Sequence, residues 1–495
     1  MHQACCTRPV VAAAPLARPQ GALCCTRAAQ QHGRVVCKLN APLRQQEPRW
    51  GAARAARRRL PRPPAAAAEL PDLDALLEAG VPEIGGDLAD VQAQQNAVFD
   101  DAGVVVHFRN DSRAMHALEH AAVVVDRSHW GRLRLAGEGR LAFLHGQSTA
   151  NLTALSPGQG CDTVFVTPQG RCIDLATVYA QGSGALVLVS PGMATAVRQR
   201  LEKHLFPADK VQVSDVGPRT CMFSLLGPQA DAVLRQLQAG DVAGAAYGSH
   251  TLLSFAGKPV IVAVGGGLPG TGYTLIADES VGADLWRIMT AQEGVEPMGT
   301  ACWEMARVMA GRPAVGSELT DDYTALDAGL YGAVSLQKGC YVGQETLAKV
   351  HNLDAVRQQL WGLEMEAPCV VGDPVLAADG RQLGAITSYI DTPSGQHRAL
   401  AYLKCRVEGR QVDLEGTAVS AGGSRGRVVL PPFLSRGFPA GEQEAAAPAA
   451  APAPAAQDDA EAAARRAQKL AEMQARLAAY QATAQQQQQQ QQGTE

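Results

Sequence analysis

The residues with the clearest chemical potential form one octapeptide, Lys338-Gly339-Cys340-Tyr341-Val342-Gly343-Gln344-Glu345. Its two glycines permit a sharp backbone turn, and residues 344–350 are mostly good helix formers with an acid in the first turn. Cys340 is therefore expected just before a helix N-terminus, with Lys338 two residues away. Both features stabilise a thiolate, the form of cysteine that attacks electrophiles and binds metals. From the residues alone, a buried structural cysteine in a glycine-rich turn is an equally good interpretation.

The octapeptide belongs to a region, residues 86–432, whose sequence pattern is typical of folded globular domains. Short β-rich runs punctuated by glycine are interleaved with amphipathic helical patterns, without the strict alternation of a doubly wound sheet. The sequence therefore predicts an α+β fold with largely antiparallel sheets. Strands are expected over residues 121–125, 132–136, 162–167, 186–189, 221–226 and 260–264, and helices over 140–145, 192–204, 229–237 and 282–292.

A change of texture after residue 352 predicts a second domain. Residues 360–429 consist almost entirely of short strand patterns separated by turn signals such as Asp379-Gly380 and Ser394-Gly395. This arrangement is typical of a small β-barrel or β-sandwich. We therefore divide the globular part into residues 86–352 and residues 353–432.

The two ends of the chain differ in composition from the globular part. The first 68 residues contain twelve Lys or Arg against one acid, Glu47, and lack the apolar core of a secretory signal. Residues 1–37 are predicted to be a transit peptide, for the chloroplast stroma in preference to the mitochondrial matrix, because residues 34–37 resemble the processing region of plastid precursors. A merely disordered basic arm is the alternative. Residues 38–85 are predicted to be a disordered linker and residues 433–495 a low-complexity Ala/Pro/Gln tail.

Composition excludes several functional classes. A net charge of −4 argues against a polybasic nucleic-acid-binding protein, and no segment approaches the roughly 20 apolar residues of a membrane helix. Neither nucleic acid nor a membrane is therefore an expected partner. The twelve cysteines include no Cys-x-x-Cys pair, and those beyond residue 40 are scattered singly, which favours a reducing compartment over a zinc ribbon or a disulfide scaffold.

Two other patterns resemble ligand-binding motifs but lack the context that those motifs need. Residues 265–270 match the Gly-x-Gly-x-x-Gly dinucleotide fingerprint, but Pro269 removes a backbone donor and residues 273–276 are strand-like, so a glycine-rich hairpin is expected. Residues 116–120 match the zinc-binding pattern His-x-x-Glu-His, but no third ligand can be named. A surface or capping role is expected for these histidines, and no metal site is predicted.

The octapeptide is similar to the signature Lys-Gly-Cys-[Phe/Tyr]-x-Gly-Gln-Glu of the YgfZ family. These proteins are folate-binding relatives of the glycine-cleavage aminomethyltransferase that assist iron–sulfur cluster assembly. Further similar blocks lie at residues 126–131, 143–149, 170–174 and 307–313, so that the resemblance covers residues 86–432. The presequence suggests the chloroplast branch of this family.

The resemblance implies a fold, a cofactor and a set of site residues. It implies three domains in a ring around a central folate channel, the last domain being a β-barrel. Carried over by position, Arg307 is similar to the arginine that reaches folate in the transferase relatives, and Asp174 to the second acid of their Asp-Asp pair. The implied cofactor is tetrahydrofolate, in a site that also includes Lys338, Tyr341, Gln344 and Glu345, with Cys340 as the reactive residue.

Two departures separate this sequence from the transferases. Ile173 stands where they have the first Asp of the pair, which is the acid used in their chemistry, and Gly270 stands where a glutamate grips the pterin. Aminomethyl transfer is disfavoured, because isoleucine cannot accept a proton. The leading hypothesis is a tetrahydrofolate-dependent accessory factor for the assembly or repair of iron–sulfur clusters. Its expected partners are iron–sulfur assembly proteins and client iron–sulfur enzymes.

Two alternative functions stay open at this level. The first is a folate-dependent one-carbon (aminomethyl or methyl) transferase or demethylase, with Glu345 or Asp174 as its base. The second is a non-catalytic interaction protein that acts through its Ala/Gln-rich tail. Deleting the residues beyond Gly437 would then abolish function, whereas we expect the truncated protein to remain functional.

Overall fold

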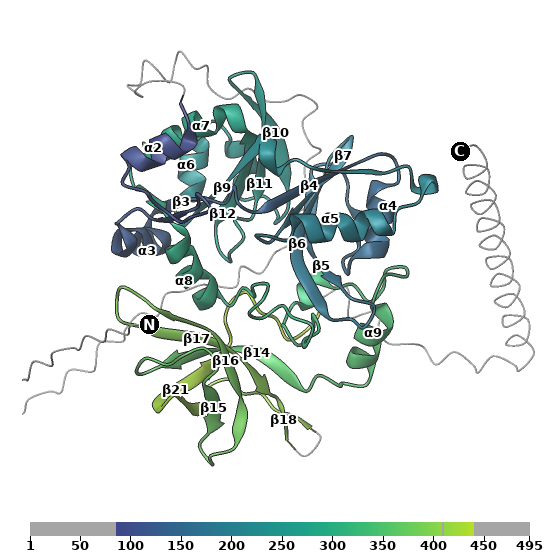
Figure 1. Cartoon of the computed structure of the whole chain (residues 1–495), viewed down its shortest axis with the longest axis vertical. Coiled ribbons are helices and arrows are strands. Elements are labelled where there is room, and N and C mark those ends of the chain that lie inside the picture. Colours follow the sequence, from purple (N-terminus) through teal and green to yellow (C-terminus); the bar gives the residue numbers. More distant parts are fainter. Residues whose placement is uncertain (1–85, 408–409, 440–495) are drawn as a thin grey trace, which may run out of the picture. The chain divides into compact units, whose positions relative to one another are not determined.

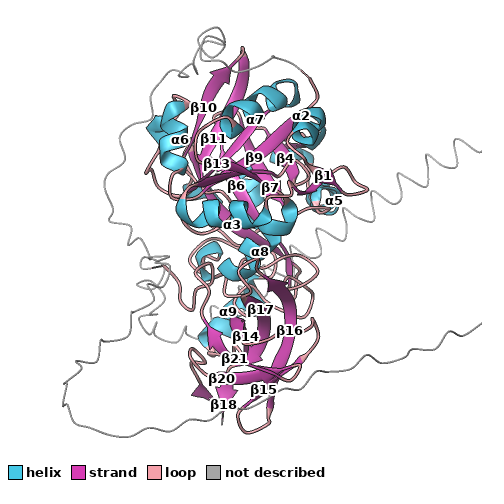
Figure 2. Cartoon of the chain, turned by 90° about the vertical axis from the view of Figure 1, so that its left-hand side faces the viewer, coloured by secondary structure: helices cyan, strands magenta, loops and turns pink. Residues whose placement is uncertain are grey.

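The computed structural model describes residues 86–407 and 410–439 (Figure 1), all within the unit Trp50–Glu495. The predicted transit peptide, the linker and the tail beyond residue 439 lie outside the described residues. Two larger open sheets, two short two-stranded ribbons, a closed barrel and the helices packed on them make up the described part (Figure 2). Within these ranges, none of the helices combines the length and the apolar character needed to span a bilayer.

The first sheet has six strands in the order β10-β11-β12-β9-β3-β13. Its neighbouring strands are antiparallel except for the edge strand β13, which pairs parallel with β3. The strands are β3 (Ala122–Asp126), β9 (Thr220–Leu226), β10 (His250–Phe255), β11 (Lys258–Val264), β12 (Gly272–Asp278) and β13 (Val295–Met298). The associated helices are α2 (Leu88–Gln94), α3 (Asp111–His120), α6 (Ala230–Gln236), α7 (Gly282–Thr290) and α8 (Thr300–Ala310), and a short ribbon is formed by β1 (Val98–Phe99) and β2 (Val105–His107).

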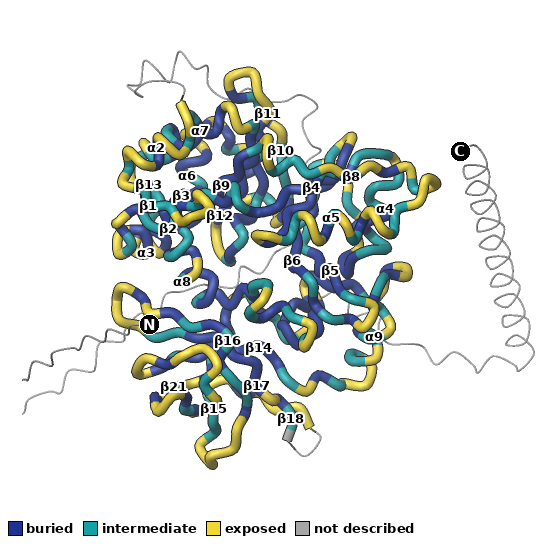
Figure 3. Tube along the Cα trace, viewed as in Figure 1, coloured by how far each residue is buried: buried dark blue, intermediate teal, exposed yellow. Residues whose placement is uncertain are grey.

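The second sheet has five antiparallel strands in the order β5-β6-β7-β4-β8. Its inner strands are buried along most of their length, as the dark blue trace in Figure 3 shows. Strand β6 is not among the strands predicted from the sequence, whereas the similarly buried strand β7 is. The elements are β4 (Gly131–Ala136), β5 (Gln159–Val166), β6 (Cys172–Ala180), β7 (Gly184–Val189), β8 (Gln212–Asp215), α4 (Arg140–Gln147) and α5 (Ala194–Lys203).

The C-terminal strands form a closed barrel, β14-β17-β16-β15-β20-β21. Closure follows because β14 pairs with both β17 and β21, which leaves no free sheet edge. The strands are β14 (Gln358–Met365), β15 (Pro374–Ala377), β16 (Gln382–Asp391), β17 (His397–Lys404), β20 (Ala418–Ala421) and β21 (Ser424–Val429), with a small ribbon of β18 (Arg406–Val407) and β19 (Arg410–Gln411). Helix α9 (Gln344–Asn352) precedes the barrel.

The structure confirms the predicted α+β class with a C-terminal β-barrel. Each strand and helix predicted in residues 121–292 coincides with an observed element, with bounds that differ by a few residues. The glycine-rich segment 265–270 connects the antiparallel strands β11 and β12, so the expected hairpin is correct. The position of the domain boundary at residue 352 stays a prediction.

The histidine pattern over residues 116–120 lies on α3. Both imidazoles are exposed, and their rings are 4.5 Å apart in an edge-to-face arrangement, which confirms the predicted surface position. Among the described residues, no three His, Cys, Asp or Glu side chains are grouped closely enough to hold a metal ion.

Candidate functional site

The octapeptide forms the loop that leads into α9. The helix begins at Gln344, as predicted, after Gly343, whose φ of 83° is left-handed. Glycine is required there, because a Cβ would lie 2.6 Å from the carbonyl oxygen of Thr167. Cys340 stands three residues before this turn and is exposed. The interpretation of Cys340 as a buried structural cysteine is therefore wrong.

Lys338 anchors the loop to the end of α4. Its side chain is buried, and Nζ donates hydrogen bonds to the carbonyl oxygens of His145 (2.5 Å), Ser148 (2.6 Å) and Ala150 (2.7 Å). Three donors meet three acceptors at the C-terminal end of a helix, where a cation is favoured. Burial nevertheless lowers the pKa of Lys338 to about 7. The ammonium group is committed to these carbonyls, and a direct role at Cys340 or folate stays a prediction.

The remaining members of the octapeptide differ in their exposure. Tyr341 is buried with its ring 4.7 Å from the Lys338 ammonium, and its hydroxyl has no hydrogen-bond partner among the described residues. Burial raises the pKa of Tyr341 to about 12. Gln344 is half-buried and Glu345 is exposed on the first turn of α9. The structure thus brings Lys338 and Tyr341 together, and the folate contacts implied for all four residues stay predictions.

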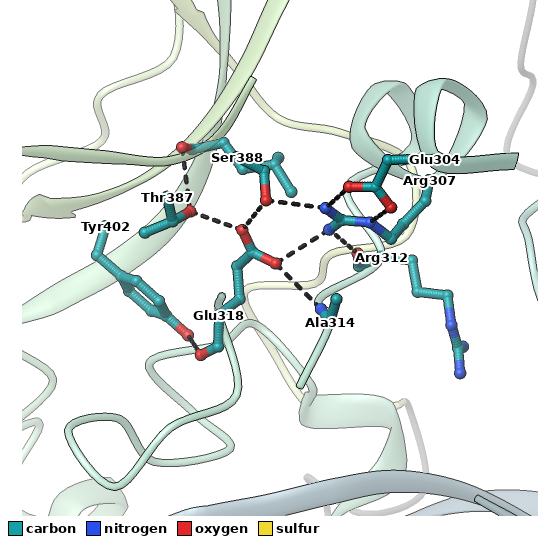
Figure 4. Close-up of polar contacts among 9 residues, drawn as sticks. Glu304, Arg307, Arg312, Ala314, Glu318, Thr387, Ser388 and Tyr402 are labelled. Atoms are coloured by element: carbon teal, nitrogen blue, oxygen red, sulfur yellow. Dashed lines mark hydrogen bonds and ion pairs between the residues drawn. The ribbon is translucent and has the colours of Figure 1, made fainter. Parts of the chain in front are cut away.

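Arg307, on α8, is buried, and all its donors are used within the protein (Figure 4). Nε and Nη2 donate to the Glu304 carboxylate, and Nη1 donates to Glu318 at 3.0 Å. Nη1 also donates to the carbonyl oxygen of Arg312 (3.0 Å) and Nη2 to the hydroxyl of Ser388 (2.8 Å). A ligand carboxylate would have to displace one of these partners, of which Glu304 is the half-exposed one. The folate contact of Arg307 stays a prediction.

Glu318 is the acceptor that ties α8 to the barrel. Its carboxylate is fully buried and accepts four hydrogen bonds, which satisfies both oxygens. Ser388 belongs to the barrel strand β16 and is hydrogen-bonded to both members of the Arg307–Glu318 ion pair. This network therefore connects α8 to the barrel. The donors to Glu318 are Arg307 Nη1 (3.0 Å), Ala314 N (3.0 Å), Thr387 Oγ1 (2.7 Å) and Ser388 Oγ (2.6 Å) (Figure 4).

Asp174 is a fully buried carboxyl group on β6. Its Oδ2 accepts a hydrogen bond from the Ser190 backbone N–H at 2.9 Å, while Oδ1 has no partner among the described residues. Burial raises the pKa of Asp174 to about 6, although the Ser190 hydrogen bonds and the positive charge of Arg312 act in the opposite direction. A carboxyl group with one unused oxygen and a pKa near neutrality is suited to accept a proton or to hold a donor group of a ligand.

Two buried arginines lie against the same indole ring. The guanidinium carbon of Arg127 is 3.8 Å from the centroid of Trp130, and that of Arg312 is 5.4 Å from it. Arg127 Nη1 donates to the hydroxyl of Ser224 and to the carbonyl oxygen of Gly266, both at 3.0 Å. The glycine loop packs over this arginine, since a Cβ on Gly267 would lie 2.6 Å from Nη1. The absence of a side chain at Gly267 thus makes room for the Arg127 guanidinium.

A second carboxylate, Asp162, lies within electrostatic reach of Arg127. Asp162 accepts from the Tyr247 hydroxyl with both oxygens at 2.9 Å and from Thr177 Oγ1 at 2.6 Å. Burial and the positive charge of Arg312 lower the pKa of Arg127 to about 9, and Asp162 acts in the opposite direction. We call these residues, Arg127, Arg312, Asp162 and Asp174, the arginine–carboxylate cluster.

Of the four residues in this cluster, only Asp174 is a site residue predicted from the sequence. Arg127 and Arg312 stand in two of the blocks that carry the family resemblance, residues 126–131 and 307–313, but nothing local distinguishes them from surface arginines. The available signal is the neighbouring Trp130, because a tryptophan close to an arginine is a common stacking partner. Position 173 contributes no carboxylate, because it is an isoleucine. Its side chain packs at the edge of the second sheet's core.

Replacement of Asp174 by asparagine should change how stability depends on pH. The pKa of Asp174 is higher in the folded protein, about 6, than its ordinary value of 3.8, so the folded state holds a proton more strongly and Asp174 weakens folding as pH rises through this window. We expect Asp174→Asn to gain up to about 3 kcal/mol of unfolding free energy relative to wild type between pH 4 and 7. Urea unfolding of both proteins across this pH range measures the difference, and a pH-independent difference would contradict the assignment.

Comparison with known proteins places the chain in a family. Residues 89–338 match the family model of the GCVT N-terminal domain. The chain is 39% identical over 360 residues, 72% of its length and 82% of the relative's, to an Arabidopsis thaliana protein named "Putative transferase, chloroplastic". It is 28% identical over 330 residues to the aminomethyltransferase of a Nostoc species, covering 64% of this chain and 87% of that enzyme.

A solved structure shows the same fold. The glycine cleavage system aminomethyltransferase T from Bartonella henselae superposes with a TM-score of 0.61 over 70% of this chain and 97% of that enzyme, at 20% identity. The expected relationship to aminomethyltransferases is therefore confirmed at the level of fold and family. The sequence match over half of the chain and the shared fold show that this protein belongs to the GCVT-domain family, which is related to the aminomethyltransferases.

Proposed function

We propose that this protein is a tetrahydrofolate-dependent accessory factor that helps to assemble or repair iron–sulfur clusters in chloroplast enzymes. The observation that carries the proposal is the exposed Cys340 thiol, presented on a loop that Lys338 anchors to α4. The similarity of the octapeptide to the YgfZ signature supports this role. One cysteine cannot hold a cluster alone, so Cys340 serves as a transient ligand of the cluster iron while assembly proteins and client enzymes supply the others.

Tetrahydrofolate fits the arginine–carboxylate cluster on chemical grounds. A pterin needs acceptors for its amidine-like edge, and the buried carboxyl group of Asp174, whose Oδ1 has no partner among the described residues, is of this kind. When bound, tetrahydrofolate carries one-carbon units. Binding of tetrahydrofolate to the purified full-length chain, measured by calorimetry, should be saturable and should weaken in Asp174→Ala. Absence of binding to the wild-type protein would exclude the folate part of the proposal.

The cluster-assembly role is tested by replacing Cys340 with alanine in a strain that lacks the native protein. We expect the activity of chloroplast iron–sulfur enzymes to stay low with Cys340→Ala and to recover with the wild-type chain. The matched control is Cys161→Ala, which removes a partly buried thiol from β5. Full recovery with the Cys340 variant would remove this cysteine from the mechanism.

The chloroplast location rests on two supports. The predicted transit peptide at residues 1–37 has the composition of an organelle presequence, and the Arabidopsis relative is named chloroplastic. The mitochondrial matrix is the alternative. Import of the full-length chain into isolated chloroplasts and mitochondria distinguishes the two locations.

A second candidate function is a folate-dependent one-carbon transferase or demethylase. It is favoured by the pKa of Asp174, about 6, which suits a proton acceptor near neutral pH, and by the transferase name of the Arabidopsis relative. Glu345 is exposed and therefore less suited to this task. Production of methylene- or formyl-tetrahydrofolate by the purified protein, with loss in Asp174→Asn, would favour this function. Aminomethyl transfer itself stays disfavoured, because Ile173 supplies no acid.

A further inference from the structure

Arg312 is a buried cation whose donors are unused. It follows Gly311, the left-handed residue (φ 80°) that ends α8, and its side chain points away from the Glu318 carboxylate (Figure 4). Only 4% of Arg312 is exposed, and its guanidinium donates no hydrogen bond to any residue within 86–407 and 410–439. Its contacts are the faces of Trp130, at 5.4 Å, and Phe433, at 5.2 Å.

Leaving such a group without hydrogen bonds is costly. A guanidinium has five donors, and a buried charged group that loses its water needs partners in the protein or in a ligand. Aromatic faces offset part of this cost. The guanidinium nitrogens of Arg312 are not among the fully enclosed unpartnered atoms, in contrast to Nε of Arg127. The donors of Arg312 therefore have no partner among the described residues and keep a slight exposure.

The surroundings of Arg312 favour an anion. Arg127 is a second buried cation on the same indole, and its Nε also has no partner among the described residues. Asp162 is already occupied by the hydroxyls of Tyr247 and Thr177. Asp174 is buried, and its pKa is raised, so the negative charge close to the arginines is weakened as pH falls. An additional negative group would reduce the repulsion between the two guanidinium groups.

We propose that Arg312 binds a carboxylate group of the ligand of the arginine–carboxylate cluster, with Arg127 strengthening the local positive field. The inference rests on the proposed folate site and assigns its cation. A planar carboxylate matches the parallel donors of a guanidinium and adds one negative charge. A phosphate dianion would add two charges beside Asp162 and Asp174. Arg307 is less suited, because its donors are all committed to the protein.

The carboxylate has two possible sources, which calorimetry on the full-length chain distinguishes. The probes are tetrahydrofolate, a tetrahydropterin without the benzoylglutamate tail, glycine and inorganic phosphate. We expect Arg312→Gln to weaken carboxylate binding by about tenfold or more and to leave tetrahydropterin binding unchanged. A loss confined to tetrahydrofolate assigns the carboxylate to the folate tail. A loss confined to glycine assigns it to a separate small acid.

The control variant is Arg219→Gln, which removes the same charge from an exposed position. Thermal unfolding verifies that Arg312→Gln is folded. Arg312→Lys keeps the positive charge but lacks the paired N–H donors of the guanidinium group, so it should lose part of the affinity for the carboxylate. Equal affinities of wild type and Arg312→Gln for tetrahydrofolate and glycine would overturn the inference, as would Arg312-dependent binding of phosphate alone. If the wild-type protein bound neither tetrahydropterin nor tetrahydrofolate, that result would instead contradict the proposed folate site.

Discussion

Replacing Glu318 by glutamine should lower the free energy of unfolding by about 3–5 kcal/mol, because it leaves the buried Arg307 without its buried counter-charge. The Glu318 carboxylate accepts four hydrogen bonds, two on each oxygen. An amide in the same place turns one acceptor into a donor that faces other donors. The substitution weakens the contact between α8 and β16, so the barrel should separate more easily from α8.

The matched control is Glu304→Gln, which removes the other acid partner of Arg307. The Glu304 side chain is 49% exposed and that of Glu318 is 0% exposed, so water can replace the Glu304 carboxylate but not that of Glu318. We expect the control to cost about 1 kcal/mol or less. Urea unfolding followed by tryptophan fluorescence compares the two variants. Equal losses would show that the Arg307–Glu318 pair is not a specific contact between α8 and the barrel.

Replacing Lys338 by methionine should lower the free energy of unfolding by about 2–4 kcal/mol and loosen the loop that carries Cys340. The variant keeps most of the side-chain volume but leaves three buried carbonyl oxygens, those of His145, Ser148 and Ala150, without their shared donor. The adjacent hydrogen bond from Val342 N–H to the Gly146 carbonyl, 3.1 Å long, should then open more often. Faster hydrogen exchange at Val342 measures this opening.

Lys349→Met is the control for the lysine prediction, since Lys349 is exposed on the neighbouring helix α9. It removes the same charge without disturbing a buried acceptor, and we expect a change within about 0.5 kcal/mol. If Lys338→Met were as stable as this control, the three hydrogen bonds would contribute nothing to folding. The loop would then have to be held by other contacts, and Lys338 would be free for a role at the ligand.

Local signals were sufficient to predict most of the elements. Strand and helix positions follow from apolar periodicity and turn residues, which act over a few neighbours along the chain. The same holds for the α9 start at Gln344, the hairpin at residues 265–270 and the β-rich C-terminal domain. Strand β6 was not among the predicted strands, although the similarly buried strand β7 was.

The partners of the charged residues were decided by the tertiary structure. Arg307 and Arg312 are the same residue type five positions apart, yet one is saturated and the other has free donors. The difference arises because Gly311 turns the chain at the end of α8 and because β16, 81 residues further on, brings Ser388 to Arg307. Likewise, Lys338 finds its three carbonyl acceptors 188 to 193 residues earlier in the chain.

The sequence by itself determined the α+β fold class, the β-rich C-terminal domain and the glycine turns, because each of these depends on residue type and short-range spacing. The closure of the barrel and the exposure of Cys340 were decided by the tertiary structure, since the residues alone allowed a β-sandwich and a buried cysteine equally well. The tertiary structure alone decided which charges are buried, paired or available to a ligand. Hydrogen bonding and desolvation depend on contacts between atoms that come together only after distant strands have packed. Short-range sequence patterns do not specify these contacts.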